Sequence, residues 1–319
     1  MTKIRSRDSS RIQDRRGQGS GSGGLGGLGD LLKGGMGGGG SGGGMPIPGG
    51  LGGLLKGGGG LIGVLVLAAV FILPKLMGGS TSTTSGVAPA AEGAGRAVDE
   101  ANSDTCSSEL EQVLCGATDD VSEYWIDQLP LSFGVEYVDT QTVFFSGSTN
   151  TGCGMASSQT GPFYCPLDNL VYFDLDFLVT LQDQFGATGD LAAQYIVAHE
   201  FGHHVQNVLR INEQMREAQQ ADPSRANQYS VALELQADCF AGAWARDASD
   251  RGLFDDPSEV EEALNAASAV GDDTIQQKTQ GRVDPESWTH GSSAQRVQWF
   301  QRGFQTGDPT KCSTFSEVL

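Results

Sequence analysis

The hydrophobic pattern divides the chain into an irregular N-terminal part and a patterned C-terminal part. Residues 1–56 lack helical or strand periodicity and are basic and then glycine-rich, which predicts a disordered tail. Residues 57–77 include a thirteen-residue apolar run, 61–73, that favours one transmembrane anchor over a cleaved signal peptide or a buried core helix. Residues 78–105 have a linker composition, and residues 106–319 are long enough for one domain with a sizeable core.

Within residues 106–319 the pattern predicts mostly helices. Apolar positions at helical spacing cover residues 107–130 with a break near Gly116, the stretch from an Asp190 N-cap to Val208, and later segments at 224–246, 256–271 and 293–304. Alternation predicts strands over 141–146 and 169–174. We therefore expect an α+β fold that is mostly α, with a small antiparallel sheet before the helix that begins at Asp190.

One stretch of that helix carries candidate chemistry. His199, Glu200 and His203 form the pattern H-E-x-x-H, and histidines four residues apart project from the same helix face. Two such imidazoles can hold one Zn²⁺, while Glu200 is placed to act on a metal-bound water as a general base. The alternative is a buried helix with hydrogen-bonded histidines, which leaves this cluster on an apolar helix unexplained.

A catalytic zinc needs a third protein ligand and one open position. Glu234 is the preferred candidate because it lies in an apolar face of the 224–246 helix. Asp238, four residues on, is expected to accept the free N–H of a ligating histidine. If this face is exposed to solvent, both carboxylates instead cap a helix or form ion pairs.

The remaining histidines have different expected roles. His290 precedes the last helix and is the rival third ligand; it is also a candidate for stabilising the oxyanion of a tetrahedral intermediate. His204 points about 100° away from His203 on the helix, so it is not expected to bind the same ion. Arg296 is a weaker candidate for pairing with an acidic group near the metal.

The distribution of charge along the chain limits the partners and the location expected for the domain. The chain has a net charge of −19, and residues 1–60 carry eight basic and three acidic side chains, so the rest carries −24. Such an acidic domain argues against a nucleic-acid partner. Positive charge before residues 57–77 predicts a cytoplasmic N-terminus and an extracytoplasmic domain.

The six cysteines agree with that location. All of them follow residue 105, which fits disulfides in an oxidising compartment. Cys106 and Cys115, and Cys153 and Cys165, are close enough in sequence to pair, which would leave Cys239 with Cys312. Six cysteines allow 15 connectivities, so this pairing is one hypothesis among several.

Together these motifs resemble the bacterial putative neutral zinc metallopeptidase family (YpfJ-like). The resemblance spans about residues 90–315 and rests on His199–Gln206, Gly161–Pro166, Glu234–Asp238 and the His290-Gly-Ser and Gln295-Arg296 pairs. It implies a zincin-like domain of the gluzincin type, with Glu234 as the third zinc ligand and Asp238 as a hydrogen-bond partner of a ligating histidine. It does not carry over a substrate.

The sequence thus predicts a single-pass membrane endopeptidase with one catalytic Zn²⁺, acting on protein or peptide substrates. In this hypothesis Glu200 deprotonates the zinc-bound water that attacks the scissile carbonyl and then protonates the leaving amine. An edge strand would pair with the substrate backbone. The alternatives are a catalytically silent, zinc-stabilised binding module of the cell envelope and a metalloenzyme acting on a non-peptide acyl bond. Oligomeric state is left open.

Overall fold

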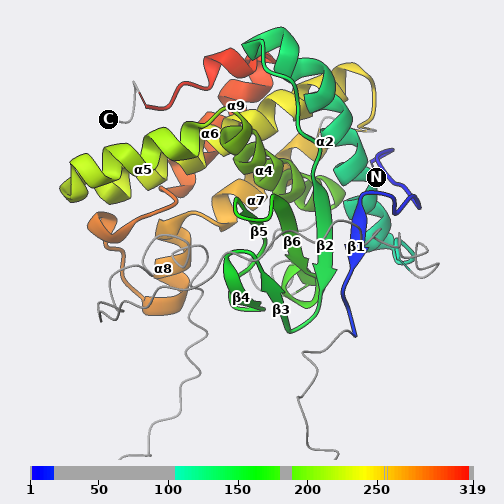
Figure 1. Cartoon of the computed structure of the whole chain (residues 1–319), viewed down its shortest axis with the longest axis horizontal. Coiled ribbons are helices and arrows are strands. Elements are labelled where there is room, and N and C mark those ends of the chain that lie inside the picture. The colour runs from blue at the N-terminus through cyan, green and yellow to red at the C-terminus, as the bar shows by residue number, and fades with distance from the viewer. Residues whose placement is uncertain (1, 18–104, 180–188, 255, 257, 316–319) are drawn as a thin grey trace, which may run out of the picture.

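The computed structural model describes residues 2–17, 105–179, 189–254, 256 and 258–315 (Figure 1). The expected anchor at 57–77 and all but the last residue of the expected linker lie outside these ranges. Within the described residues no helix combines the length and the apolar composition needed to cross a bilayer.

Helices dominate the described structure and form most of its core (Figure 1). They are α2 (Glu109–Phe133), α4 (Asp190–Val208), α5 (Ile211–Ala221), α6 (Ala226–Asp250), α7 (Glu259–Ala269), α8 (Asp272–Gln280) and α9 (Ser293–Thr306). Three short 3₁₀ turns lie at Pro223–Arg225, Pro285–Ser287 and Pro309–Lys311. Asp190 is the first residue of α4 rather than its cap, which is Gly189.

Four strands form a mixed sheet beside the helices. Its order is β1 (Ile12–Asp14), β2 (Gln141–Phe145), β6 (Leu170–Asp174) and β5 (Phe163–Cys165). The first two pairings are parallel and only β5 and β6 run antiparallel, while β3 (Ser148–Thr151) and β4 (Gly154–Ser157) form a separate antiparallel pair.

The predicted antiparallel sheet is therefore wrong in the direction of its two main strands. β2 and β6 are parallel because the chain between them is long enough to cross back, and it contains β3, β4 and β5. Neither predicted strand is an edge strand. The edge on this side of the sheet is β5, whose Tyr164 contacts His204 on α4.

The predicted disordered tail is wrong for residues 2–17, which we call the N-terminal segment. It lies against the domain and adds β1 to the edge of β2. Its few apolar residues give no periodic signal, although Ile4 is buried in the main core. The predicted break at Gly116 is absent as well. A Cβ there would lie 2.8 Å from Cα of Arg5, so glycine makes room for this segment.

Two glycines bring α6 and α9 into close contact. A Cβ on Gly242 of α6 would lie 2.0 Å from the carbonyl oxygen of Phe300, and one on Gly303 of α9 would lie 1.9 Å from that of Cys239. The two backbones can approach only because both side chains are absent. This crossing places the start of α9 beside the middle of α6, where the candidate acidic residues lie.

Three disulfides staple the domain, and their pairing is the one favoured by sequence spacing. Cys106–Cys115 joins the start of α2 to its second turn, and Cys153–Cys165 links the loop after β3 to β5. Cys239–Cys312 ties α6 to the C-terminal region at the residue that follows Asp238. The third bridge thus fixes the chain end next to the candidate site.

Candidate metal centre

Two helices bring three candidate ligands to one point. His199 and His203 come from α4 and Glu234 from α6, and one potential ligand atom of each lies within 4.8 Å of the others. Nε2 of His199 is 3.2 Å from one Glu234 oxygen, and Nε2 of His203 is 3.5 Å from the other. The two imidazoles therefore converge on the carboxylate from one side.

The outer nitrogen of each imidazole has its own acceptor. Nδ1 of His199 lies 2.9 Å from Oδ1 of Asp238, and Nδ1 of His203 lies 2.9 Å from Oε1 of Gln206. With the protons on Nδ1, both Nε2 lone pairs are free for a metal. Gln206 is itself fixed, because its amide nitrogen donates to the carbonyl oxygen of Leu233 at 2.8 Å.

Asp238 is the centre of a buried polar network. It accepts hydrogen bonds from Nε and Nη2 of Arg296, at 2.8 and 2.9 Å, and from the hydroxyl of Tyr195 at 2.6 Å. Burial alone would raise the pKa of Asp238, but Arg296 and His199 hold it below its ordinary value. The carboxylate thus stays ionised behind His199, and the start of α9 is joined to the ligand helices.

The buried charges at this point balance only if protons or a metal ion neutralise some of the carboxylates. Glu200, Glu234 and Asp238 are at most 8% exposed and supply three negative charges when ionised, whereas buried Arg296 supplies one positive charge. Burying two uncompensated charges is costly unless protons or a metal neutralise them. Burial by itself lowers the pKa of His199, but Asp238 and Glu234 raise it to about 9. A divalent cation supplies the missing charge, so the donor set fits Zn²⁺.

Glu200 differs from the other two carboxylates. It is 3% exposed, and within the described part of the chain its Oε2 has no hydrogen-bond partner. Burial raises its pKa, and the negative charge of Glu234 adds to the effect. A buried carboxylate oxygen without a partner, next to a candidate metal ligand, is free to accept a proton from a reacting group.

The comparisons with known proteins agree with this geometry. A family described as "putative neutral zinc metallopeptidase" matches residues 1–315. The chain belongs to this family. The protein named YpfJ from Escherichia coli is 46% identical over 214 residues, covering 67% of this chain and 73% of YpfJ. Mb2605 from Mycobacterium bovis is 53% identical over 182 residues, 54% of this chain and 61% of Mb2605. Both relatives carry the description "uncharacterized protein", and no solved structure matches the chain.

His290 is not one of the three residues whose potential ligand atoms converge. Its loop packs on α6 through Gly291, which approaches Val231 and Leu235 on either side of Glu234. Within the described residues the only cluster of histidine, cysteine and acidic side chains fit to hold a metal contains Glu234 and not His290. We therefore assign His290 no ligand role.

Asp272, at the start of α8, fixes the His290 loop. One of its oxygens accepts the backbone N–H groups of Thr289, His290 and Gly291 at 2.8, 2.7 and 3.1 Å. The other accepts Nδ1–H of His290 at 3.0 Å. This arrangement leaves Nε2 of His290 as the free nitrogen and holds the ring in one orientation.

His204 faces away from the ligand triad. Its Nε2 donates to the carbonyl oxygen of Val138 at 2.6 Å, and its Nδ1 lies 3.1 Å from the hydroxyl of Tyr164. Its role is to pack α4 against the sheet and the loop before β2. The expectation that it points away from His203 agrees with these contacts.

Sequence reasoning missed Gln206, Asp272 and the central place of Arg296. Gln206 follows His203 by three residues and His199 by seven, so helical spacing alone puts all three on one face. Asp272 is separated from His290 by eighteen residues and has no comparable signal. Arg296 reaches the site only through the close crossing of α6 and α9.

Proposed function

We propose that this protein is a zinc-dependent endopeptidase that cuts protein or peptide chains outside the cytoplasm. The observation that carries the proposal is the convergence of His199, His203 and Glu234 beside Glu200, whose buried Oε2 has no hydrogen-bond partner among the described residues. Membership of the family supports the same class of activity. The three disulfides favour an oxidising compartment.

Each of the chain's own groups has a task in this reaction. His199, His203 and Glu234 hold the metal, and Asp238 fixes the orientation of His199. When bound, zinc acts as a Lewis acid toward the scissile carbonyl and lowers the pKa of water. Glu200 takes the proton of the attacking water and delivers it to the leaving amine.

His290 acts on the other side of the scissile bond in this proposal. Asp272 keeps the proton of His290 on Nδ1 in the resting state, so a hydrogen bond to the developing oxyanion requires a protonated ring. His290 then stabilises charge that develops only in the transition state.

The proposal includes attachment to a cell membrane through residues 57–77. The apolar run 61–73 supports it, because no buried position within a folded domain accounts for an apolar segment flanked by glycine-rich sequence. Anchoring would keep the domain at the membrane surface and its substrates among envelope proteins.

The test is cleavage of an unfolded protein by the zinc-loaded full-length chain. We expect one zinc per chain, loss of cleavage after treatment with a chelator, and recovery when zinc is restored. Fragments are identified by mass spectrometry, so that hydrolysis of peptide bonds is seen directly. A chain that binds zinc but cleaves no unfolded protein is instead a silent binding module.

A change at Asp272 should slow the reaction without removing the metal. In Asp272→Asn the side chain can no longer accept all four hydrogen bonds that hold the His290 loop and ring, so we expect kcat to fall about tenfold, less than the 10²–10³-fold cost of losing an oxyanion donor. KM and zinc content should change little. The measurement is steady-state kinetics across pH, with metal content determined on the same samples.

The matched control is the neighbouring residue Asp273. It accepts the backbone N–H and the hydroxyl of Ser293 at the start of α9, both at 2.7 Å, and forms no hydrogen bond or ion pair with His290. Asp273→Asn should lower thermal stability and leave the pH profile of kcat unchanged. Equal kinetic effects of both changes would reduce the role of Asp272 to stability alone.

A further inference from the structure

The N-terminal segment reaches the ends of both helices that carry the candidate ligands. The backbone N–H of Lys3 donates to the carbonyl oxygen of Leu253, just past the end of α6, at 2.9 Å. Arg5 pairs with Asp190, the first residue of α4, at 2.7 Å. The segment therefore joins the end of one ligand helix to the start of the other.

The domain is shaped to receive this segment. The side chain of Ile4 is only 5% exposed, and its carbonyl oxygen accepts the amide of Gln194 on α4 at 3.1 Å. Gly116 of α2 leaves the space in which the backbone of residues 4–5 lies. Buried apolar surface and satisfied buried polar groups distinguish a fitted site from a tail that merely touches the surface.

The second half of the segment extends the sheet. β1 pairs in parallel with β2 from Ile12 opposite Thr142 to Asp14 opposite Phe144. Opposite charges add to these contacts, because the segment is basic and the domain acidic. Arg11 lies within 3.5 Å of Asp119 and Asp139, and Arg16 forms an ion pair with Glu111.

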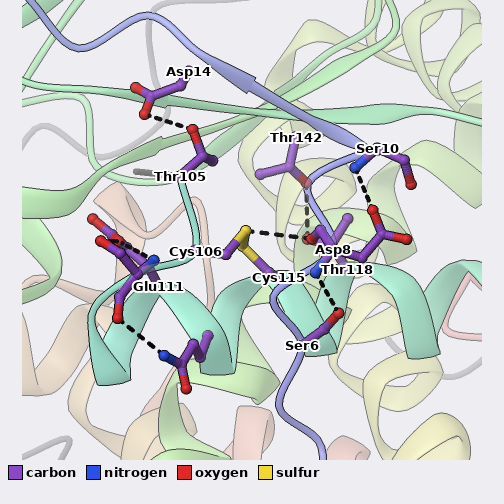
Figure 2. The surroundings of a disulfide bond; sticks show 12 residues. Ser6, Asp8, Ser10, Asp14, Thr105, Cys106, Glu111, Cys115, Thr118 and Thr142 are labelled. Atoms are coloured by element: carbon purple, nitrogen blue, oxygen red, sulfur yellow. Dashed lines mark hydrogen bonds between the residues drawn. A yellow bond between two sulfur atoms is a disulfide. The ribbon is translucent and has the colours of Figure 1, made fainter. Parts of the chain in front are cut away.

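The chain leaves and re-enters the domain at one place. The hydroxyl of Thr105 donates to Oδ2 of Asp14 at 3.0 Å, and Sγ of Cys106 lies 3.3 Å from the carbonyl oxygen of Asp8 (Figure 2). The described residues before position 18 therefore lie beside those that follow position 104. A single crossing by residues 57–77 would put Asp14 and Thr105 on opposite sides of a hydrocarbon layer about 30 Å thick. Within one chain, these contacts are incompatible with the predicted combination of a cytoplasmic N-terminus and an extracytoplasmic domain.

We propose that the N-terminal segment is a detachable clip that binds the domain from the same side of the membrane and holds the ends of α4 and α6 together. Membrane attachment through residues 57–77 is then not the single crossing that the sequence predicts. Because α4 and α6 carry His199, His203 and Glu234, release of the clip loosens the metal centre; this last step rests on the proposed function. The partner of the docking surface is thus residues 2–17 of the same chain.

A cysteine pair tests the docking in intact cells. The side chains of half-buried Gln13 and exposed Gln141 are hydrogen-bonded at 2.6 Å, and all six native cysteines are paired. Because Gln13 lies opposite Val143, two residues from Gln141, the two thiols are too far apart for a disulfide, so in the full-length chain carrying Gln13→Cys and Gln141→Cys we expect a short bis-maleimide to cross-link them within the monomer. The control pair, Gln13→Cys with Glu217→Cys on α5, lies across the molecule and should not cross-link (Figure 1).

Each other result overturns the proposal. A cross-linked dimer shows that the segment docks on a second copy, and the absence of any cross-link shows that the segment and the domain are apart. Neither readout requires zinc, so failure here is distinct from failure of the proposed function.

Loss of zinc to a chelator tests the effect on the metal centre. The double variant Arg5→Ala, Arg16→Ala removes the ion pairs to Asp190 and Glu111, and we expect zinc to leave about tenfold faster, as after loss of an outer-shell contact. Arg7→Ala, an exposed position of the same segment, should behave like the native chain. If the double variant abolishes the cross-link and zinc leaves at the native rate, the segment does not act as a clip. If the chain binds no zinc at all, the proposed function fails and the cross-link alone decides the docking.

Discussion

Glu200→Gln should retain one zinc per chain and lose nearly all peptide hydrolysis. The amide has the shape of the carboxylate but cannot accept and return a proton, and a lost general base costs about 10²–10⁴-fold in rate. Because Oε2 of Glu200 has no hydrogen-bond partner among the described residues, the change should break few contacts within the fold. The measurement combines kcat, zinc content and thermal unfolding on one preparation.

Glu213→Gln is the matched control for this change. Glu213 lies on α5, where it forms an exposed ion pair with Arg210, and its replacement should leave cleavage unaltered. If Glu200→Gln keeps its turnover while zinc is bound, Glu200 is not the base and the proposed chemistry is wrong.

Glu234→Gln should lose zinc, and with it all activity. A carboxylate that approaches both histidines through different oxygens is expected to be worth more than an outer-shell contact, whose loss costs about 10–100-fold in metal affinity. We therefore expect the affinity of Glu234→Gln for zinc to fall by more than 100-fold. Competition with a chelating dye measures this directly.

Two further variants make the result specific. Asp238→Asn should weaken zinc binding by about 10–100-fold, because the native Asp238 orients His199 but is not itself a ligand. His290→Ala should keep full zinc content and lose only rate. The reverse pattern, with zinc lost from His290→Ala and kept by Glu234→Gln, would make His290 the third ligand.

Folding must be monitored in the Asp238 variant. Asp238→Asn leaves the guanidinium of Arg296 buried with a weaker partner, and breaking a buried ion pair costs about 3–5 kcal/mol. Zinc affinity should therefore be measured at a temperature where circular dichroism shows the native helix content. The substitution Arg296→Lys tests the same network by changing the donor, because lysine cannot make the two parallel hydrogen bonds of the guanidinium to Asp238.

Local periodicity explains why much of the candidate site could be predicted from the sequence. His199 and His203 share a helix face because of their spacing, and Glu234 and Asp238 do so for the same reason on a second helix. Because buried polar side chains need partners, two apolar helices that carry these residues are expected to pack with them facing each other. The structure does bring these side chains together, while the roles of Glu200, His290 and the ligands stay predictions.

Contacts between distant segments were harder to predict. Strand direction in the sheet depends on the path of residues 146–169, and alternation within a strand carries no information about its partner. The N-terminal segment docks through backbone pairing, one isoleucine and several ion pairs, none of which produces a periodic pattern. Gly116 resembles a helix break in sequence, but its lack of a side chain serves a neighbour that lies more than a hundred residues earlier.

During synthesis, β1 is made long before β2, the strand with which it pairs in parallel. Ile12–Asp14 leave the ribosome first, yet the strand that receives them is made about 130 residues later. Pairing over so long a separation is slow, and until it occurs the edge of β2 is open to strands of other chains. Residues 2–17 thus wait for a strand that is made after them, and aggregation during that interval should depend on how soon they dock on the domain.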